Sequence, residues 1–552
     1  MSQPTPAVVA ERGAQRMPRL ALLLFCAAYV LPGLFGRDPW RNADLTAYGF
    51  MASIAQGEAS WWSPAIAGIP ADGGLLSYWL GAAAIKLLPF MEPATAARLP
   101  FGLILAAVLV LVWYSCFHLA CTPAAQPVAF AFGGEAQAVD YARALADGAL
   151  LALMATLGLL QLGHETTPEL LQLLAATLYL YGLACAPSRP SKAKLSMLLA
   201  LPTLAGSGAP AVALALGLGG GLMLARSSHD AARGMARWIL IATLLAAFCA
   251  WELNAWAWRI AAPPDGFLRQ LPSLLAWFCW PAWPLALWTA WRWRAHWRRR
   301  HVSVPLLGSI VGLATCILMG GSDRALLLAL PSLAVMAAFA LPTLKRSVAA
   351  AIDWFSVFFF SAFALFVWLY YASMQTGWPP QLLANLRRLA DGFEPSFGLL
   401  ALILGVVASL AWCLLVRWRT SRHQHAIWKS MVLPAGGVAL SWLLFMTLWL
   451  PAFDFARSNT PLVERLAALI PRSANCIAAP GHALSTLAAL EFQGGWKVDA
   501  LAPLTSTSCN FAVQLSANPV VAIAPSGWEW VGTVRRPTDR AQSFTVLRRS
   551  QR

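Results

Sequence analysis

The stretch "LALLLFCAAYVLPGLFGRDPWRNADLTAYGF", residues 20–50, places an uninterrupted apolar run directly before a segment with two aspartates and two arginines. An apolar run of this kind indicates a helix in a lipid bilayer. The basic flank "ERGAQRMPRL" precedes it, and no small-residue cleavage site follows, so we interpret the run as a retained first span and not as a signal peptide. The charged segment then emerges on the far side of the membrane.

The composition of the whole chain agrees with a membrane protein. Of its 552 residues 59% are hydrophobic and only 12% are charged, and the mean hydropathy is +0.60, so it has roughly half the charge of an ordinary soluble protein. Alternation with a period of two does not recur, which favours helices over a β-barrel. We therefore predict an all-α polytopic membrane protein with about 12 or 13 transmembrane helices. They are expected near residues 18–36, 75–90, 96–118, 144–163, 167–185, 197–225, 237–257, 272–291, 303–320, 325–342, 354–372, 397–416 and 430–451.

The positive charges indicate the orientation. The net charge is +16, and the clusters "RWRAHWRRRH" (292–301) and "RWRTSRHQH" (417–425) lie between apolar runs. The positive-inside rule places them in the cytoplasm, as anchors against anionic membrane lipids, with no nucleic acid as a partner. If every expected span crosses the membrane, the number of spans before the basic loop "SRPSKAK" (188–194) places this loop on the outer side, against the positive-inside rule. Either this loop is an exception or one short apolar segment does not cross.

Three regions follow from this pattern. Residues 1–17 form a basic cytoplasmic tail, residues 18–451 form the transmembrane domain, and residues 452–552 form a small α/β domain in the periplasm, where short helices alternate with runs such as "CIAA", "FAVQLSANPVVAIAP" and "SFTVLRR". The protein is thus expected in a bacterial-type inner membrane. Two of the ten cysteines, Cys476 and Cys509, lie in the last region and are candidates for a disulfide, with two buried free thiols as the alternative.

The outer loop at residues 37–74 has features of a structured surface segment. Asn42 can cap a helix that begins at Ala43, and Asp44 would lie in its first turn, where the helix dipole favours a carboxylate. Apolar residues then recur with helical spacing, as in a helix that lies along a membrane surface.

The series of residues from Asp38 to about residue 115, written D, Y, A, G, W, P, G-x-P, YWL, A, L and ARLP, resembles the GT-C glycosyltransferases of the protein O-mannosyltransferase and aminoarabinose-lipid A transferase type. The resemblance implies an acidic pair in the surface helices of the first outer loop and a second motif, Glu-Lys-Pro-Pro. By position, Asp44 matches the first acid and Leu45 stands where the second is usual. Asp72 is nearest to the glutamate of the second motif, and Gly73 replaces its lysine.

The chemistry that the resemblance implies requires a base and a positive group just outside the bilayer. Transfer from a polyprenyl-phosphate sugar needs a carboxylate that accepts the proton of the acceptor hydroxyl, and cations that stabilise the leaving phosphate. Asp44 and Asp38 are the candidate catalytic carboxylates. Arg37, Arg41 and Arg98 are the candidate phosphate ligands, because a guanidinium binds phosphate through two hydrogen bonds.

Two further aspartates are candidates for substrate binding. Asp72 is one by its position in the second motif, and Asp147 resembles an aspartate that enters a comparable span in the family. Structural roles remain open for the candidates. Asp44 could be a helix N-terminal residue, and Asp38 and Asp72 could be turn residues. Arg37 and Arg41 could be anchors for lipid head groups, and Asp147 could pair with Arg143 on a helix.

The resemblance thus implies an inverting membrane glycosyltransferase that moves a sugar from a polyprenyl-phosphate donor to a lipid or protein acceptor at the periplasmic face. One alternative is a non-catalytic membrane binding or assembly factor with the GT-C fold, which Leu45 and Gly73 favour. A lipid or polysaccharide transporter is a second alternative, although the apolar cores carry almost no charge. A divalent cation can take part in such chemistry, but the sequence shows no metal-ligand spacing that requires one.

Overall fold

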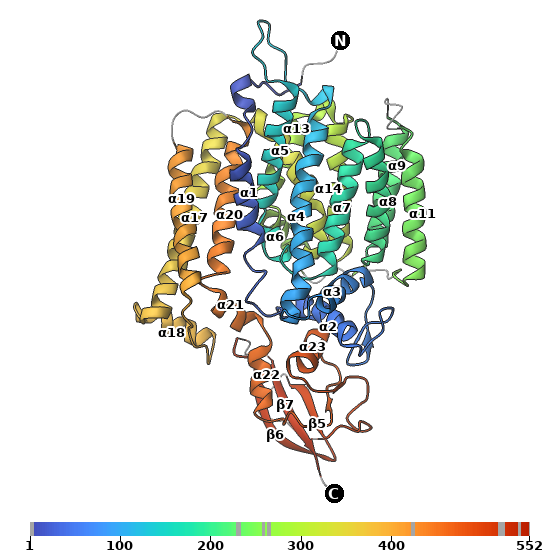
Figure 1. The fold of residues 1–552 in the computed structure, drawn as a ribbon, viewed down its shortest axis with the longest axis vertical. Coiled ribbons are helices and arrows are strands. Elements are labelled where there is room, and N and C mark those ends of the chain that lie inside the picture. Colours follow the sequence, from blue (N-terminus) through green and yellow to red (C-terminus); the bar gives the residue numbers. More distant parts are fainter. Residues whose placement is uncertain are drawn as a thin grey trace. The chain divides into compact units, whose positions relative to one another are not determined.

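The computed structural model describes residues 5–227, 233–256, 260–261, 266–420, 426–516, 525–538 and 542–550. The chain folds into two compact units that interleave along the sequence (Figure 1). Unit 1 comprises Met1–Gly33, Phe101–Leu365 and Ile403–Leu444, and unit 2 comprises Leu34–Pro100, Phe366–Leu402 and Phe445–Arg552. The two units therefore differ from the predicted division at residue 451, because unit 2 contains residues on both sides of it. Parts of two predicted features, residues 421–425 and 517–524, lie outside the described residues.

Unit 1 is a bundle of apolar helices. Within the described residues, seven helical segments are long and apolar enough to cross a membrane, which agrees with the predicted polytopic all-α architecture. Other predicted spans are shorter or interrupted helices. The elements are α1 (Arg19–Val30), α4 (Pro93–Ala120), α5 (Ala138–Met154), α6 (Leu157–Leu162), α7 (Pro168–Cys185), α8 (Pro190–Gly206), α9 (Pro210–Ala225), α11 (Ala236–Glu252), α12 (Phe267–Phe278), α13 (Ala282–Arg292), α14 (Arg300–Leu318), α15 (Asp323–Leu326), α16 (Leu330–Ala340), α17 (Arg346–Thr376), α19 (Leu399–Thr420) and α20 (Val432–Phe445), where α4, α17, α19 and α20 extend into unit 2.

Two predicted spans are wrong because each contains a helix break. The segment 197–225 divides into α8 and α9 at Gly208, whose φ of +91° ends the first helix before Pro210 begins the second. The segment 272–291 divides into α12 and α13 next to Pro281, because proline cannot donate the backbone hydrogen bond that would continue α12.

A third predicted span, near residues 75–90, is a surface helix of unit 2. Helix α3 (Leu75–Leu87) has 13 residues and a length of about 20 Å, against the ~30 Å of the hydrocarbon core. It packs closely on α2 (Ala43–Gln56), since a Cβ at Gly81 would overlap the Met51 side chain. The division of 197–225 into α8 and α9 adds a crossing between the loop 188–194 and the cluster 292–301, so both fall on the same side. The cavity that Arg189 and Arg300 both line agrees with this topology.

The C-terminal part of unit 2 is a small α/β domain, as predicted. It follows α21 (Leu450–Arg457) and comprises α22 (Thr460–Ala467), α23 (Leu484–Ala488) and a sheet in the order β4-β3-β5-β7-β6. Strand β3 runs parallel to β4 and β5, and β7 runs antiparallel to β5 and β6. The strands are β3 (Ile477–Ala478), β4 (Val498–Asp499), β5 (Phe511–Ser516), β6 (Trp528–Arg535) and β7 (Ser543–Arg549).

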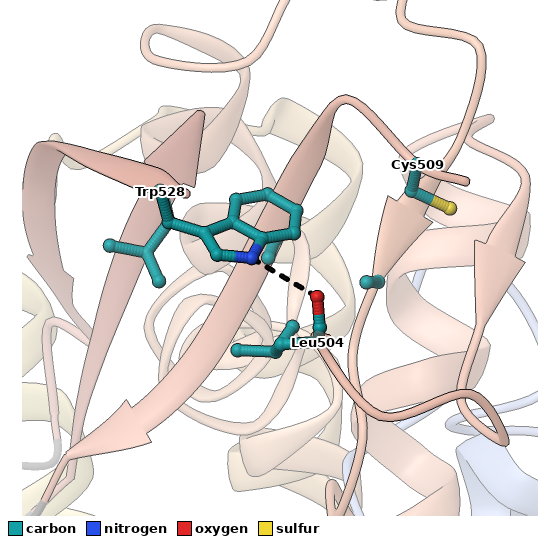
Figure 2. Close-up of a cluster of buried hydrophobic side chains, with 6 residues drawn as sticks. Leu504, Cys509 and Trp528 are labelled. Carbon is teal, nitrogen blue, oxygen red and sulfur yellow. Dashed lines mark hydrogen bonds between the residues drawn. The ribbon is translucent and has the colours of Figure 1, made fainter. Parts of the chain in front are cut away.

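A tryptophan organises the core of this domain. The indole Nε1 of Trp528 donates to the carbonyl oxygen of Leu504 at 3.1 Å, so its polar atom is satisfied although the ring is buried (Figure 2). Around it pack Ala478, Cys509, Ala512 and Leu547. Cys509 lies at this core and forms a disulfide with Cys476, which closes a loop with a sequence separation of 33.

The disulfide gives a testable stability prediction. Replacing Cys476 and Cys509 together by alanine is expected to lower the free energy of unfolding of the domain by roughly 3 to 4 kcal/mol, because the open loop has more conformational entropy in the unfolded chain. Thermal unfolding and limited proteolysis of the full chain measure the change. The matched control replaces the exposed free cysteines Cys121 and Cys413. Equal unfolding midpoints in the two double variants would contradict the prediction.

Candidate functional site

The polar segment that follows α1 is held by an enclosed ion pair in unit 2. Asp44, in the first turn of α2, is 1% exposed, and its Oδ2 accepts hydrogen bonds from Arg37 Nη1 at 2.9 Å and from the backbone N–H of Trp40 at 3.0 Å. Asn42 occupies the predicted N-cap position, but its side chain makes no capping hydrogen bond. The Asp44 carboxylate instead fixes the preceding segment against the start of α2.

Arg98 fixes the same segment from α4. Its guanidinium is 1% exposed, and it donates to the carbonyl oxygens of Leu34 at 3.2 Å and Arg37 at 2.8 Å. Backbone carbonyls that would otherwise be buried without a donor are thereby satisfied. In the structure, Arg98 thus orients the backbone of the polar segment.

Asp38 joins this segment to α21 and the turn that follows it. Its Oδ2 accepts hydrogen bonds from the hydroxyls of Ser458 and Thr460, both at 2.6 Å. In return, the Asp38 backbone N–H and the Trp40 indole donate to Asp454 Oδ1 at 3.0 and 3.1 Å. Two carboxylates from distant parts of the sequence are therefore brought together in unit 2.

A pocket with a volume of about 400 Å³ opens at this junction. Four carboxylates line it, those of Asp38, Glu394, Asp454 and Glu464, with the hydroxyls of Ser458 and Thr460. The rest of its wall is largely apolar and includes two aromatic rings. Among the described residues that line the pocket there is no lysine, arginine or histidine. The pocket can accept protons and hydrogen bonds but supplies no positive side chain of its own.

Asp454 has an altered acidity. Burial, with a smaller contribution from the negative charge of Asp38, raises the pKa of Asp454 to about 6. Because this pKa is higher in the folded protein than in the unfolded chain, the folded state binds the additional proton between about pH 4 and 6. Asp454 therefore makes its most favourable contribution to the stability of the folded state below about pH 4. This contribution is lost as the pH rises to about 6 and above.

The Asp454→Asn variant tests this pH dependence. Asparagine stays neutral, so the variant is expected to gain in unfolding midpoint relative to the wild type between pH 4 and pH 7. The measurement is thermal unfolding across this range, with Asp391→Asn, an exposed carboxylate of the same unit, as the control. Parallel curves for wild type and Asp454→Asn would contradict the assignment.

Positive charge lies beside the pocket residues. The guanidinium groups of Arg37 and Arg457 lie 4.6 and 5.7 Å from the ring centre of Trp40. The backbone N–H of Arg41 donates to the carbonyl of Arg457. The partly exposed Arg41 side chain makes no hydrogen bond or ion pair with the described part of the chain. Of the predicted phosphate ligands, Arg41 is the one whose charge is available to a ligand.

Tyr48 lies in the same environment. It follows Asp44 by one helical turn on α2. Burial, together with the charge of Glu92, raises the pKa of its hydroxyl to about 12, and Arg98 and Asp38 also act on it. The hydroxyl therefore stays protonated as a potential hydrogen-bond donor.

The remaining predicted residues lie elsewhere. Asp72 is exposed in the loop before α3. Asp147 belongs to α5 of unit 1, where its carboxylate accepts hydrogen bonds from the Met17 backbone N–H and the Trp113 indole, both at 2.8 Å. Asp147 thus holds the N-terminal segment in place through the backbone of Met17. Among the described residues, no three histidine, cysteine, aspartate or glutamate side chains are grouped so that they could hold a metal ion, and this includes the four carboxylates of the pocket.

Comparison with known proteins identifies the fold. No protein-family model and no characterised protein sequence matches the chain. The structure of ArnT from Cupriavidus metallidurans in the apo state matches with a TM-score of 0.60, covering 96% of this chain and 98% of that chain at 14% identity. The chain has the ArnT fold. ArnT bound to undecaprenyl phosphate matches with a TM-score of 0.57 and 12% identity, covering 96% of each chain. ArnT is a GT-C glycosyltransferase, so the predicted GT-C-like fold is confirmed.

Proposed function

We propose that this protein is a membrane glycosyltransferase that takes a sugar from a polyprenyl-phosphate donor and transfers it to a lipid or protein acceptor at the periplasmic face. The observation on which the proposal rests is the pocket-facing carboxylate of Asp38 beside the enclosed Arg37–Asp44 pair. The ArnT fold supports it, since a structure of ArnT holds undecaprenyl phosphate.

Asp38 is the best-placed general base. Its carboxylate lines the pocket, and the hydroxyls of Ser458 and Thr460 orient it through Oδ2. A carboxylate in this position can accept the proton of an acceptor hydroxyl as that oxygen attacks the anomeric carbon. Attack from the face opposite the leaving phosphate would invert the anomeric configuration.

The arginines have separate roles in this proposal. Arg41 would bind the departing phosphate, because its charge has no protein partner in the described structure. Arg37 adds positive charge while Asp44 fixes its position. Asp44 is thus a positioning residue, although the sequence motif marked it as a catalytic carboxylate.

A second candidate function is a non-catalytic factor that binds a lipid-linked sugar without transferring it. Leu45 is completely buried where the family usually has its second acid, and no cation lines the pocket within the described residues. Such a protein would bind the donor and leave its glycosyl bond intact.

A transfer assay separates the two functions. The full chain in lipid is incubated with a panel of radiolabelled polyprenyl-phosphate sugars and an envelope extract of lipids and proteins, with EDTA and Mg²⁺ arms to determine metal dependence. Label in the acceptor fraction is expected with one or more donors. Saturable donor binding without labelled product would support the non-catalytic function, and the absence of any donor binding would contradict both.

A further inference from the structure

A second large cavity lies wholly within unit 1, about 710 Å³ in volume. Three stretches form it: the end of α4 with residues 121–123, the turn from α7 to α8, and Arg300 at the start of α14. Helices α7, α8 and α14 pack side by side (Figure 1). The cavity is at the end of the bundle that the basic loops predict to be cytoplasmic.

The cavity is positively charged. Arg189, Lys192 and Arg300 line it, together with the His118 ring and three residues that carry hydroxyls. No aspartate or glutamate is among its described lining residues. The side chains of Arg189 and Lys192 make no hydrogen bond or ion pair within the described ranges. Like charges gathered without a counter-charge repel one another, which an anion in the cavity would relieve.

Arg300 has unused hydrogen-bonding capacity at this cavity. Its Nη2 donates to the Leu183 carbonyl, but Nε and Nη1 are shielded from solvent and have no partner among the described residues. An enclosed donor without a partner is costly, and a guanidinium suits the oxygens of a phosphate group.

The start of α8 contributes a further positive element. This helix of 17 residues begins at Pro190, and no side chain caps its first turn. The free backbone N–H groups and the helix dipole at such an end favour an anion. The hydroxyl of Ser191 lines the cavity at the same place.

We propose that this cavity binds the phosphate-bearing head group of an anionic phospholipid. Its wall also contains Phe117, Ala184 and three prolines, and such apolar surface suits the glycerol and first methylene groups of a lipid better than a soluble phosphate compound. Basic pockets between helices on the cytoplasmic side are suited to anionic lipids. The proposal is independent of the glycosyltransferase activity.

The test measures lipid binding to the delipidated full chain in detergent. The probes are dioleoylphosphatidylglycerol, tetraoleoyl cardiolipin, dioleoylphosphatidylcholine and inorganic phosphate, and the readouts are the unfolding midpoint and the number of lipids retained in native mass spectrometry. The Arg189→Gln/Lys192→Gln variant is expected to lose affinity for the anionic lipids by roughly 25-fold, at about fivefold for each charge. Arg300→Gln is expected to lose about fivefold or more.

The matched control is Arg294→Gln/Arg298→Gln, which removes two exposed charges from the basic loop before α14 that do not line the cavity. It should retain wild-type affinity within about twofold, as a surface charge outside the site has little effect on a specific contact. Equal losses in the two double variants, or equal binding of phosphatidylcholine, would overturn the proposal. If inorganic phosphate raised the unfolding midpoint as much as the anionic lipids do, the proposal would also be overturned, in favour of a soluble anion.

Discussion

Replacing Asp38 by asparagine is expected to lower sugar transfer by about two to four orders of magnitude while the protein still folds. The variant retains an oxygen that can accept hydrogen bonds from the hydroxyls of Ser458 and Thr460, so the local geometry is preserved. It loses the ability to take a proton at neutral pH. The effect should therefore appear in kcat, with donor binding little changed.

The control for this prediction comes from the same pocket. Glu394→Gln removes another carboxylate of the wall and is expected to change transfer by less than about tenfold, because its carboxylate has no place in the proposed proton transfer. Turnover and donor affinity are measured for both variants beside the wild type. Full turnover in Asp38→Asn, or an equal loss in Glu394→Gln, would remove Asp38 from the role of base.

Replacing Asp44 is expected to destabilise the protein by about 3 to 5 kcal/mol. Asp44 and Arg37 have side chains that are each 1% exposed, so Asp44→Asn removes the ion-pair partner of a guanidinium in an enclosed site. The same change also weakens the hydrogen bond that fixes Trp40. The unfolding midpoint of the full chain in detergent measures the loss.

Two variants make this prediction specific. The double variant Arg37→Gln/Asp44→Asn removes both charges and should recover part of the stability. Asp140→Asn breaks an exposed pair with Arg143 and should cost less than about 1 kcal/mol. If Asp44→Asn were no less stable than Asp140→Asn, the pair would not have the structural role that its burial indicates.

The membrane class and the helical architecture could be predicted because they depend on local composition. Apolar runs located most helices of unit 1, and alternating short elements located the C-terminal domain. Helix α3 was misassigned because its apolar residues pack on α2, and apolar composition alone does not distinguish such packing from contact with lipid.

The candidate site was predictable only where it is local. Asp38, Arg37 and Asp44 lie within one short segment, so their proximity followed from the sequence. Asp454 is 416 residues from Asp38, and no pattern of spacing reports a contact over such a distance. The available signal was the polar run "DFARSNT" (454–460) directly after the last apolar run of the sequence, which corresponds in position to the polar segment after the first apolar run.

The interleaving of unit 2 along the chain also determines the order in which the protein can mature. Asp38 is synthesised 420 residues before Ser458, an interval of about 20 to 80 seconds at ordinary elongation rates. During that time the ribosome delivers nearly the whole of unit 1. A chain that terminates before residue 450 would contain the apolar helices of unit 1 yet lack α21, so the pocket cannot form until nearly the whole of unit 1 has been synthesised.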